Sequence, residues 1–185
     1  SSIQFLQLTP SSFQSITETS NGFDNFRLGT DFGEPYIATN PNKPLNSICA
    51  FNNNKVYVTQ DGVNWNLVNA APGTGADPFV CFDSLGTAYY SYLAGMFIGG
   101  KISRSTDKGL NWTNFTLYNG SIDKPSIVAV QSGGPYTNNL YAIWQHSQND
   151  SVNIISFSKS TNSAQNWSTP IRVSIFNISY CPWIT

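Results

Sequence analysis

Short apolar stretches alternate with polar turns along most of the chain. In segments such as VYV at 56–58 and ISR at 102–104, successive side chains differ in character, as they do along an extended strand with two different faces. Asn, Ser, Gly and Pro gather between these stretches, where they favour tight turns. The pattern predicts an all-β domain built from short antiparallel strands.

Prolines mark a repeat within this pattern. Four segments place a proline directly before a short apolar strand: EPYIA at 34–38, DPFVC at 77–81, KPSIV at 124–128 and CPWIT at 181–185. Their prolines are separated by 43, 47 and 57 residues. A period of about 50 residues indicates a structural unit that recurs along the chain.

A second motif recurs in phase with the prolines. STDKGLNW at 105–112 has a shorter relative, TQDGVNW at 59–65, and a more divergent one, STNSAQNW at 160–167. Each unit then divides into a proline-led strand, a second strand, a third that runs into the motif and a fourth that leaves from its tryptophan. We therefore expect three four-stranded antiparallel units, as in the blades of a β-propeller.

The STDKGLNW stretch resembles the Asp-box, or BNR repeat, of sialidase-like β-propellers, whose consensus is Ser-x-Asp-x-Gly-x-x-Trp. The resemblance extends from about residue 34 onward and implies an incomplete ring of blades. We expect an N-terminal segment at 1–33 whose IQFLQL stretch could close the ring, blade 1 at 34–76, blade 2 at 77–122, blade 3 at 123–180, and the start of a fourth blade at 181–185. The remaining blades would come from a longer chain or from a second chain.

The residue types of the motif suit a hairpin turn. Hydroxyl and carboxylate oxygens accept hydrogen bonds from turn N–H groups, glycine tolerates a positive φ, and tryptophan can pack between blades. By resemblance, this turn lies away from any active site and has a structural role. The residues concerned are Thr59, Asp61, Gly62, Trp65, Ser105, Asp107, Gly109, Trp112, Ser160, Asn162 and Trp167.

Composition narrows the function. Only 10% of residues are charged and the net charge is −1, so the chain lacks the basic surface typical of nucleic-acid-binding proteins. No apolar run approaches the roughly 20 residues that span a bilayer. The three cysteines, Cys49, Cys81 and Cys181, are an odd number, and the sequence leaves their pairing open.

Three acidic residues precede the repeated prolines. Glu34 and Asp77 directly precede Pro35 and Pro78, and Asp123 precedes the Lys-Pro pair at 124–125. On three neighbouring blades these carboxylates would ring the mouth of the central channel. They could bind Ca²⁺, or they could bind a cationic or sugar ligand. The alternative is that they accept hydrogen bonds from the backbone of the adjacent blade.

The match to sialidase catalytic residues is weak. The family's Phe-Arg-Ile-Pro motif has its nearest counterpart in Phe26-Arg27, which lacks the Ile and Pro and lies before the first proline-led strand. Asn52 and Asn53 stand where the family's acidic aspartate is expected, and the other arginines, Arg104 and Arg172, fall near outer strands.

Candidate glycosylation sites fit an extracellular or cell-surface location. The sequons begin at Asn114, Asn119, Asn149 and Asn177, and two further ones fall inside the turn motifs. We therefore expect an extracellular β-propeller that acts as a binding or structural and assembly module, with a glycan or protein ligand, no certain cofactor and no catalytic residue in this segment. The alternative is a sialidase-type glycoside hydrolase whose catalytic residues lie mostly in the missing blades.

Overall fold

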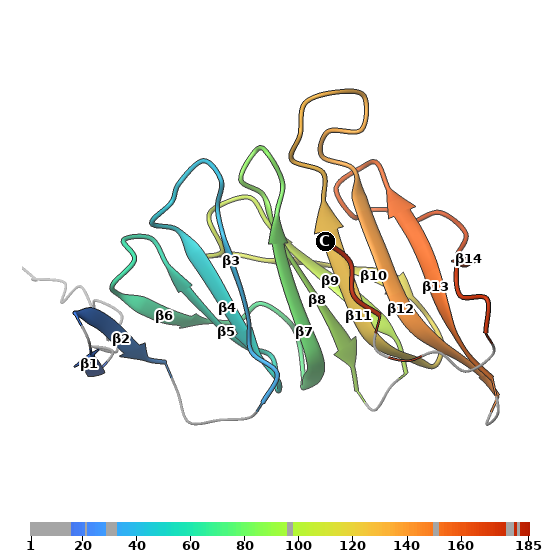
Figure 1. Ribbon diagram of the computed structural model, residues 1–185, viewed down its shortest axis with the longest axis horizontal. Coiled ribbons are helices and arrows are strands. Elements are labelled where there is room, and N and C mark those ends of the chain that lie inside the picture. The colour runs from blue at the N-terminus through green and yellow to red at the C-terminus, as the bar shows by residue number, and fades with distance from the viewer. Residues whose placement is uncertain are drawn as a thin grey trace, which may run out of the picture.

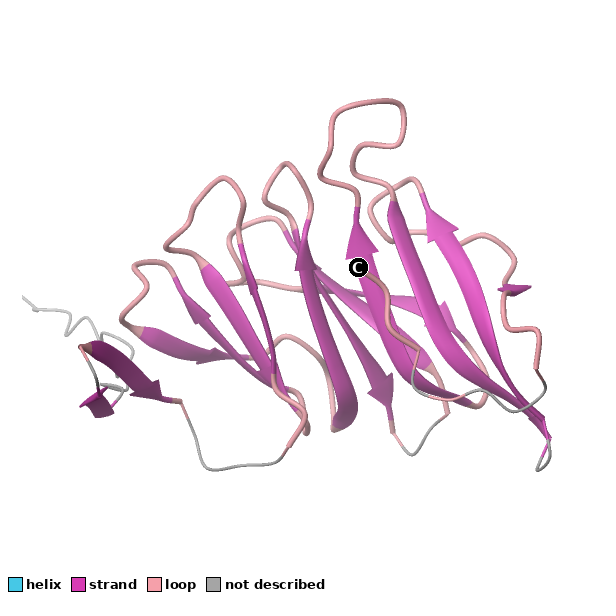
Figure 2. Cartoon of the chain, in the orientation of Figure 1, coloured by secondary structure: helices cyan, strands magenta, loops and turns pink. Residues whose placement is uncertain are grey.

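The computed structural model describes residues 16–20, 22–28, 33–95, 98–149, 152–176, 180 and 182–185. This described part consists of strands and loops, and it contains no helix that could cross a membrane. Three antiparallel four-stranded sheets follow one another along the chain (Figures 1 and 2). The predicted all-β class is confirmed. A separate hairpin, β1 (Ile16–Ser20) and β2 (Phe23–Arg27), precedes the three sheets.

Each sheet is a meander in which strands adjacent in sequence pair with each other. The first sheet comprises β3 (Tyr36–Thr39), β4 (Ser47–Phe51), β5 (Lys55–Thr59) and β6 (Trp65–Val68). The second comprises β7 (Gly75–Phe82), β8 (Ala88–Ala94), β9 (Gly100–Ser105) and β10 (Thr113–Tyr118). The third comprises β11 (Ile122–Ala129), β12 (Leu140–Asn149), β13 (Val152–Ser160) and β14 (Ile171–Arg172).

The second sheet is packed on both faces. Tyr90 on β8 joins a core with Ile48 and Val58 of the first sheet. Its neighbour Tyr89 belongs to a different core, which includes Trp144 of the third sheet. Successive side chains of a strand point to opposite faces, so β8 supplies both cores at once. This explains why AYYSYLA is almost continuously buried although its sequence gives no alternation of apolar and polar residues.

The first strands of the three sheets lie next to one another. β7 contacts both β3 and β11, so the three strands form one side of the stack (Figure 1). In the second and third sheets the repeated proline sits in a register shift, between Ala76 and Phe79 on β7 and between Asp123 and Ser126 on β11. Proline has no N–H to give to a ladder, and a bulge accommodates that loss.

The residue before each of these prolines has a positive φ. The angles are 63° at Glu34, 52° at Asp77 and 49° at Lys124. A left-handed conformation is uncommon for residues other than glycine, asparagine and aspartate. Its recurrence at three equivalent positions shows that one backbone geometry is repeated in all three sheets.

The three hairpin turns that carry the repeated motif share their hydrogen bonds. In the second turn, Ser105 Oγ donates to Asp107 Oδ1 at 2.7 Å and accepts from the N–H of Gly109 at 2.9 Å. Asp107 Oδ1 also accepts from the N–H of Asn111 at 2.9 Å. The third turn repeats all three bonds through Ser160, Asn162, Ala164 and Asn166, and the first repeats them one residue shorter through Thr59, Asp61, Gly62 and Asn64.

The second and third turns each reach toward the preceding sheet. A Cβ on Gly109 would lie 3.0–3.1 Å from side-chain atoms of Ile48 and Val58 in the first sheet. Trp112 packs against the core between the first two sheets, and Trp167 packs against the core between the second and third. The turns therefore connect consecutive sheets as well as closing their own hairpins.

Two strands differ from the sequence-based expectation. The fourth strand of the third sheet does not begin at Trp167: β14 covers Ile171–Arg172 alone, because Pro170 cannot donate to a ladder. Residues 182–185 form no strand, and Trp183 instead packs against Tyr36 and Phe79. The IQFLQL stretch, expected to close a ring, lies outside the described residues.

Replacing Gly109 by alanine should destabilise the protein by about 1–3 kcal/mol. Its φ of 92° is strained for an L residue, and the new methyl would meet the first sheet. Urea denaturation followed by tryptophan fluorescence measures the loss. Gly133→Ala is the control, because a methyl group added there would meet no atom within 4 Å and the backbone φ is ordinary. Equal midpoints for the two variants would contradict this prediction.

The acidic turns should make stability depend on acid pH. Hydrogen bonds from Asn64 and Val63 hold the pKa of Asp61 well below its usual value. Burial alone would raise the pKa of Asp107, but hydrogen bonds from Asn111 and Ser105 lower it below the usual value. A carboxyl group whose pKa is lowered by folding stabilises the fold at pH values above its unfolded pKa of about 3.9. This stabilisation is lost as the pH falls below that value.

The double variant Asp61→Asn/Asp107→Asn should therefore melt below wild type at pH 7, and the gap should narrow as the pH falls below about 4. Circular dichroism melts between pH 2 and 7 measure this convergence. A gap that stays constant with pH would show that the two carboxylates do not contribute through their charge.

Candidate functional site

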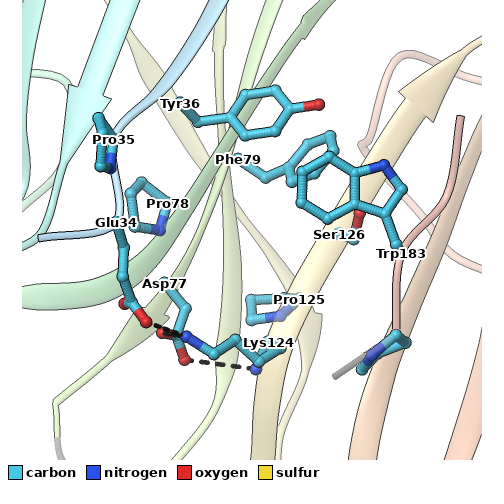
Figure 3. Close-up of a pocket in the computed structure, with 11 residues that line it drawn as sticks. Glu34, Pro35, Tyr36, Asp77, Pro78, Phe79, Lys124, Pro125, Ser126 and Trp183 are labelled. Carbon is cyan, nitrogen blue, oxygen red and sulfur yellow. Dashed lines mark hydrogen bonds and ion pairs between the residues drawn. The ribbon is translucent and has the colours of Figure 1, made fainter. Parts of the chain in front are cut away.

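A cavity of about 320 Å³ lies where the first strands of the three sheets begin. Its wall consists of the repeated proline tripeptides 34–36, 77–79 and 124–126, completed by Pro182 and Trp183 (Figure 3). Its volume falls within the range of small-ligand sites. Segments far apart in sequence thus contribute equivalent residues to one site.

Charged side chains gather on one side of the cavity. Lys124 Nζ donates to Asp77 Oδ1 at 2.6 Å and forms a second ion pair with Glu34 (Figure 3). Partial burial alone would lower the pKa of Lys124, but its hydrogen bonds to Asp77 and Glu34 raise it above the ordinary value. One ammonium therefore joins a carboxylate from each of the two preceding sheets.

Asn52 holds the two carboxylate-bearing segments in place. Its side-chain amide donates to Glu34 Oε2 at 3.1 Å and accepts from the N–H of Asp77 at 2.9 Å. Asn52 belongs to the turn between β4 and β5, so the first sheet positions a backbone group of the second. The positions of Glu34 and Asp77 therefore do not depend on the flexible lysine alone.

Aromatic rings form the other side of the cavity. Tyr36 stacks on Phe79 with ring centroids 3.8 Å apart, and Trp183 lies 5.5 Å from Tyr36 and 5.2 Å from Phe79 (Figure 3). Phe79 is buried, whereas Trp183 is 64% exposed. The trio therefore offers an accessible indole supported by two rings.

One polar group in the wall lacks a hydrogen-bond partner. Ser126 is 3% exposed, and its hydroxyl has no partner within the described structure. An unpaired buried hydroxyl costs about 1–3 kcal/mol, and the positive φ angles at Glu34, Asp77 and Lys124 add strain of a similar order.

Two of the three carboxylates predicted from the sequence lie at the cavity, and the third does not. Glu34 and Asp77 come together at the cavity, but Lys124 lies between them. Asp123 does not line the cavity; its Oδ1 accepts from the N–H of Lys124 at 3.1 Å. The third position of the repeat is thus a lysine, and three carboxylates do not ring the site. Among the described residues, no three His, Cys, Asp or Glu side chains gather in a way that could hold a metal ion.

The arginines lie elsewhere. Arg104 donates to the carbonyl of Ser163 at 2.9 Å and lies over the ring of Phe115. Arg172 donates to backbone carbonyls beyond β14, and Arg27 lies on β2. None of these three lines the cavity. The described residues therefore assemble no arginine cluster for a carboxylate substrate.

The remaining predicted positions are dispersed. Asn114 is exposed but accepts a hydrogen bond from Ser103 at 2.6 Å, and Asn119 is exposed in the loop after β10. The Asn149 side chain and all of Asn177 lie outside the described residues, as does Cys181. Cys49 and Cys81 are free thiols, and burial raises the pKa of Cys49 to about 11.

Sequence reasoning missed half of this site. It identified the acidic residues before the prolines but overlooked Lys124 and the residues that follow each proline. The signal was present: the residue after the proline is Tyr36, Phe79, Ser126 or Trp183, and all four line the cavity. Aligning the tripeptides by their prolines would have found both halves.

Comparison with solved structures supports the fold. A protein of unknown function from Dyadobacter fermentans superimposes with a TM-score of 0.54 and 17% identity, over 76% of this chain and 55% of that one. Two structures of an exo-β-1,3-galactanase from Phanerochaete chrysosporium, both with β-1,3-galactotriose, give TM-scores of 0.53 and 0.51 at 19% and 18% identity. They cover 75% of this chain and 35% of the galactanase.

These likenesses show an all-β fold that also occurs in a galactanase. This chain spans about half the length of the first neighbour and about a third of the second. No family model matches the sequence, and no curated protein does.

The ion cluster gives a stability prediction. Lys124→Gln should cost about 1–2 kcal/mol at pH 7, because it leaves the Asp77 side chain, 8% exposed, without its cation. A lysine whose pKa is raised by folding stabilises the fold to its full extent at pH values below the unfolded pKa of about 10.4. This stabilisation is lost as the pH rises above that value. The difference from wild type in urea denaturation should therefore hold up to about pH 10 and then shrink.

Lys101→Gln is the matched control. Lys101 Nζ donates to Thr116 Oγ1 at 2.8 Å across two strands of the second sheet and has no carboxylate partner there. Its replacement should change stability by no more than about 0.5 kcal/mol. Equal losses in the two variants would mean that the cluster adds nothing beyond an ordinary surface lysine.

Proposed function

We propose that this chain is the saccharide-binding part of an extracellular Asp-box β-propeller, and that it binds its ligand in the cavity between the proline tripeptides. Three sequential four-stranded sheets with equivalent hairpin turns support the propeller, with further blades from the same or a second chain. The exposed sequons at Asn114 and Asn119 support an extracellular location.

One observation carries the proposal: an exposed indole and a hydrogen-bonding cluster face the same cavity. Trp183 offers an aromatic face for the C–H groups of a sugar ring, while Glu34, Asp77 and Lys124 offer acceptors and a donor for its hydroxyls. Mostly apolar walls with a few convergent polar groups are typical of small-ligand sites.

Binding fits the described residues better than catalysis. Lys124 engages both carboxylates of the cavity, so neither is left facing a substrate alone. A glycoside hydrolase remains the second candidate, because two carboxylates do line the cavity and glycosidases commonly act through such a pair. In that case the acid and the nucleophile would come from this pair or from further blades.

Trp183→Ala should weaken saccharide binding. A panel of neutral oligosaccharides that includes β-1,3-galactotriose would be titrated against the full chain, with tryptophan fluorescence and calorimetry as readouts. The variant should bind about five- to thirtyfold more weakly, because stacking on an exposed aromatic contributes about 1–2 kcal/mol to such complexes.

Tyr136→Ala is the control for this experiment. Tyr136 is also 64% exposed, but it lies in the loop that follows the opposite end of β11. Its replacement should leave binding unchanged. Failure of the wild-type chain to bind any saccharide would refute the proposed function, and release of reducing sugar from the panel would favour the hydrolase.

A further inference from the structure

We infer that the cavity selects neutral and amino sugars and rejects sugars that carry a carboxylate. The inference rests on the proposed saccharide binding and specifies the class of sugar. It follows from the balance of charge around the cavity and from the hydrogen bonds that its polar groups have still to make.

Negative charge predominates at the cavity. Glu34 and Asp77 line it against the single cation Lys124, which leaves one net negative charge among the described lining residues. Asp123 adds another carboxylate just outside, bonded to the N–H of Lys124. A carboxylated sugar would therefore enter a field of its own sign, whereas an amino sugar would be attracted.

The one cation is already engaged. An ammonium has three N–H donors, and Lys124 directs one to Asp77 and one to Glu34. A ligand carboxylate would have to share the remaining donor and lie beside two carboxylates. Proteins that bind carboxylates tightly commonly use the paired N–H groups of arginine, and no arginine is among the described lining residues.

The same groups suit uncharged hydroxyls. Glu34 and Asp77 are acceptors, so they can receive hydrogen bonds from sugar hydroxyls while keeping their bonds to Lys124. Ser126 also lines the wall, but its hydroxyl oxygen is buried, so the hydrogen bonds to a sugar would come from Glu34, Asp77 and Lys124.

The test compares sugars of one ring configuration that carry a neutral, an acidic or a basic substituent. Methyl β-galactoside, galacturonate and galactosamine would be titrated against the full chain at 20 mM and 500 mM salt, with the gluco-configured series in parallel. We expect galacturonate to bind at least tenfold more weakly than the neutral sugar at low salt, with the gap narrowing at high salt as screening increases.

A charge-reversing variant identifies the cause. Glu34→Gln/Asp77→Asn keeps the shapes of both side chains but changes the lining from net negative to net positive, so galacturonate should then bind at least as tightly as the neutral sugar. Asp61→Asn is the control, because Asp61 lies in a hairpin turn beside the C-terminal end of β3, whereas the cavity lies at the N-terminal end. This variant also removes one negative charge, but discrimination against galacturonate should persist.

The outcomes separate the two proposals. If no sugar of either series binds the wild-type chain, saccharide binding fails and this inference fails with it. If galacturonate binds as well as the neutral sugar, saccharide binding stands and the inference is overturned. If discrimination survives in the charge-reversing variant, shape and not charge excludes the acid, and the inference is overturned as well.

Discussion

A proline directly before or within the first strand of each sheet is the constraint from which the rest of the site follows. Because proline cannot donate a backbone hydrogen bond, each sheet must either interrupt its hydrogen bonds at the proline or begin them after it. The chain does so with a bulge in the second and third sheets and with a left-handed residue before the proline in all three. The side chains on either side of the proline are then equivalent from sheet to sheet. Stacking the sheets brings them together.

The two ends of the stack are held by different chemistry. At the hairpin end, hydroxyl, carboxylate and amide oxygens satisfy turn N–H groups locally, and the tryptophans join neighbouring sheets through packing. At the cavity end, sheets are joined by hydrogen bonds and ion pairs of two side chains: Asn52 accepts from the backbone N–H of Asp77, and Lys124 pairs with Asp77 and Glu34. Both ends contain a buried polar group without a hydrogen-bond partner, the indoles of Trp65 and Trp167 near the hairpins and the hydroxyl of Ser126 at the cavity. What distinguishes the cavity end is that its charged side chains and the exposed Trp183 line a hollow.

The sequence predicts the repeat well because proline and turn residues act locally. Their spacing alone indicates three four-stranded units, and the turn donors and acceptors follow from residue type. The site was predicted less completely, for two physical reasons. A residue before proline ordinarily adopts an extended conformation, so the left-handed geometry that brings Lys124 to Glu34 and Asp77 could not be foreseen. The contact of Trp183 with Tyr36 and Phe79 depends on tertiary packing between segments some 100 and 150 residues apart.

The cavity owes its existence to a break in symmetry. After the repeated proline, three copies place an aromatic ring and one places Ser126. Four rings at equivalent positions would fill the centre with side chains, as in an ordinary core. Ser126 is the one small residue of the four, and it lines the cavity together with the three rings. A larger side chain at this one position would narrow the cavity while the sheets, turns and prolines stay as they are.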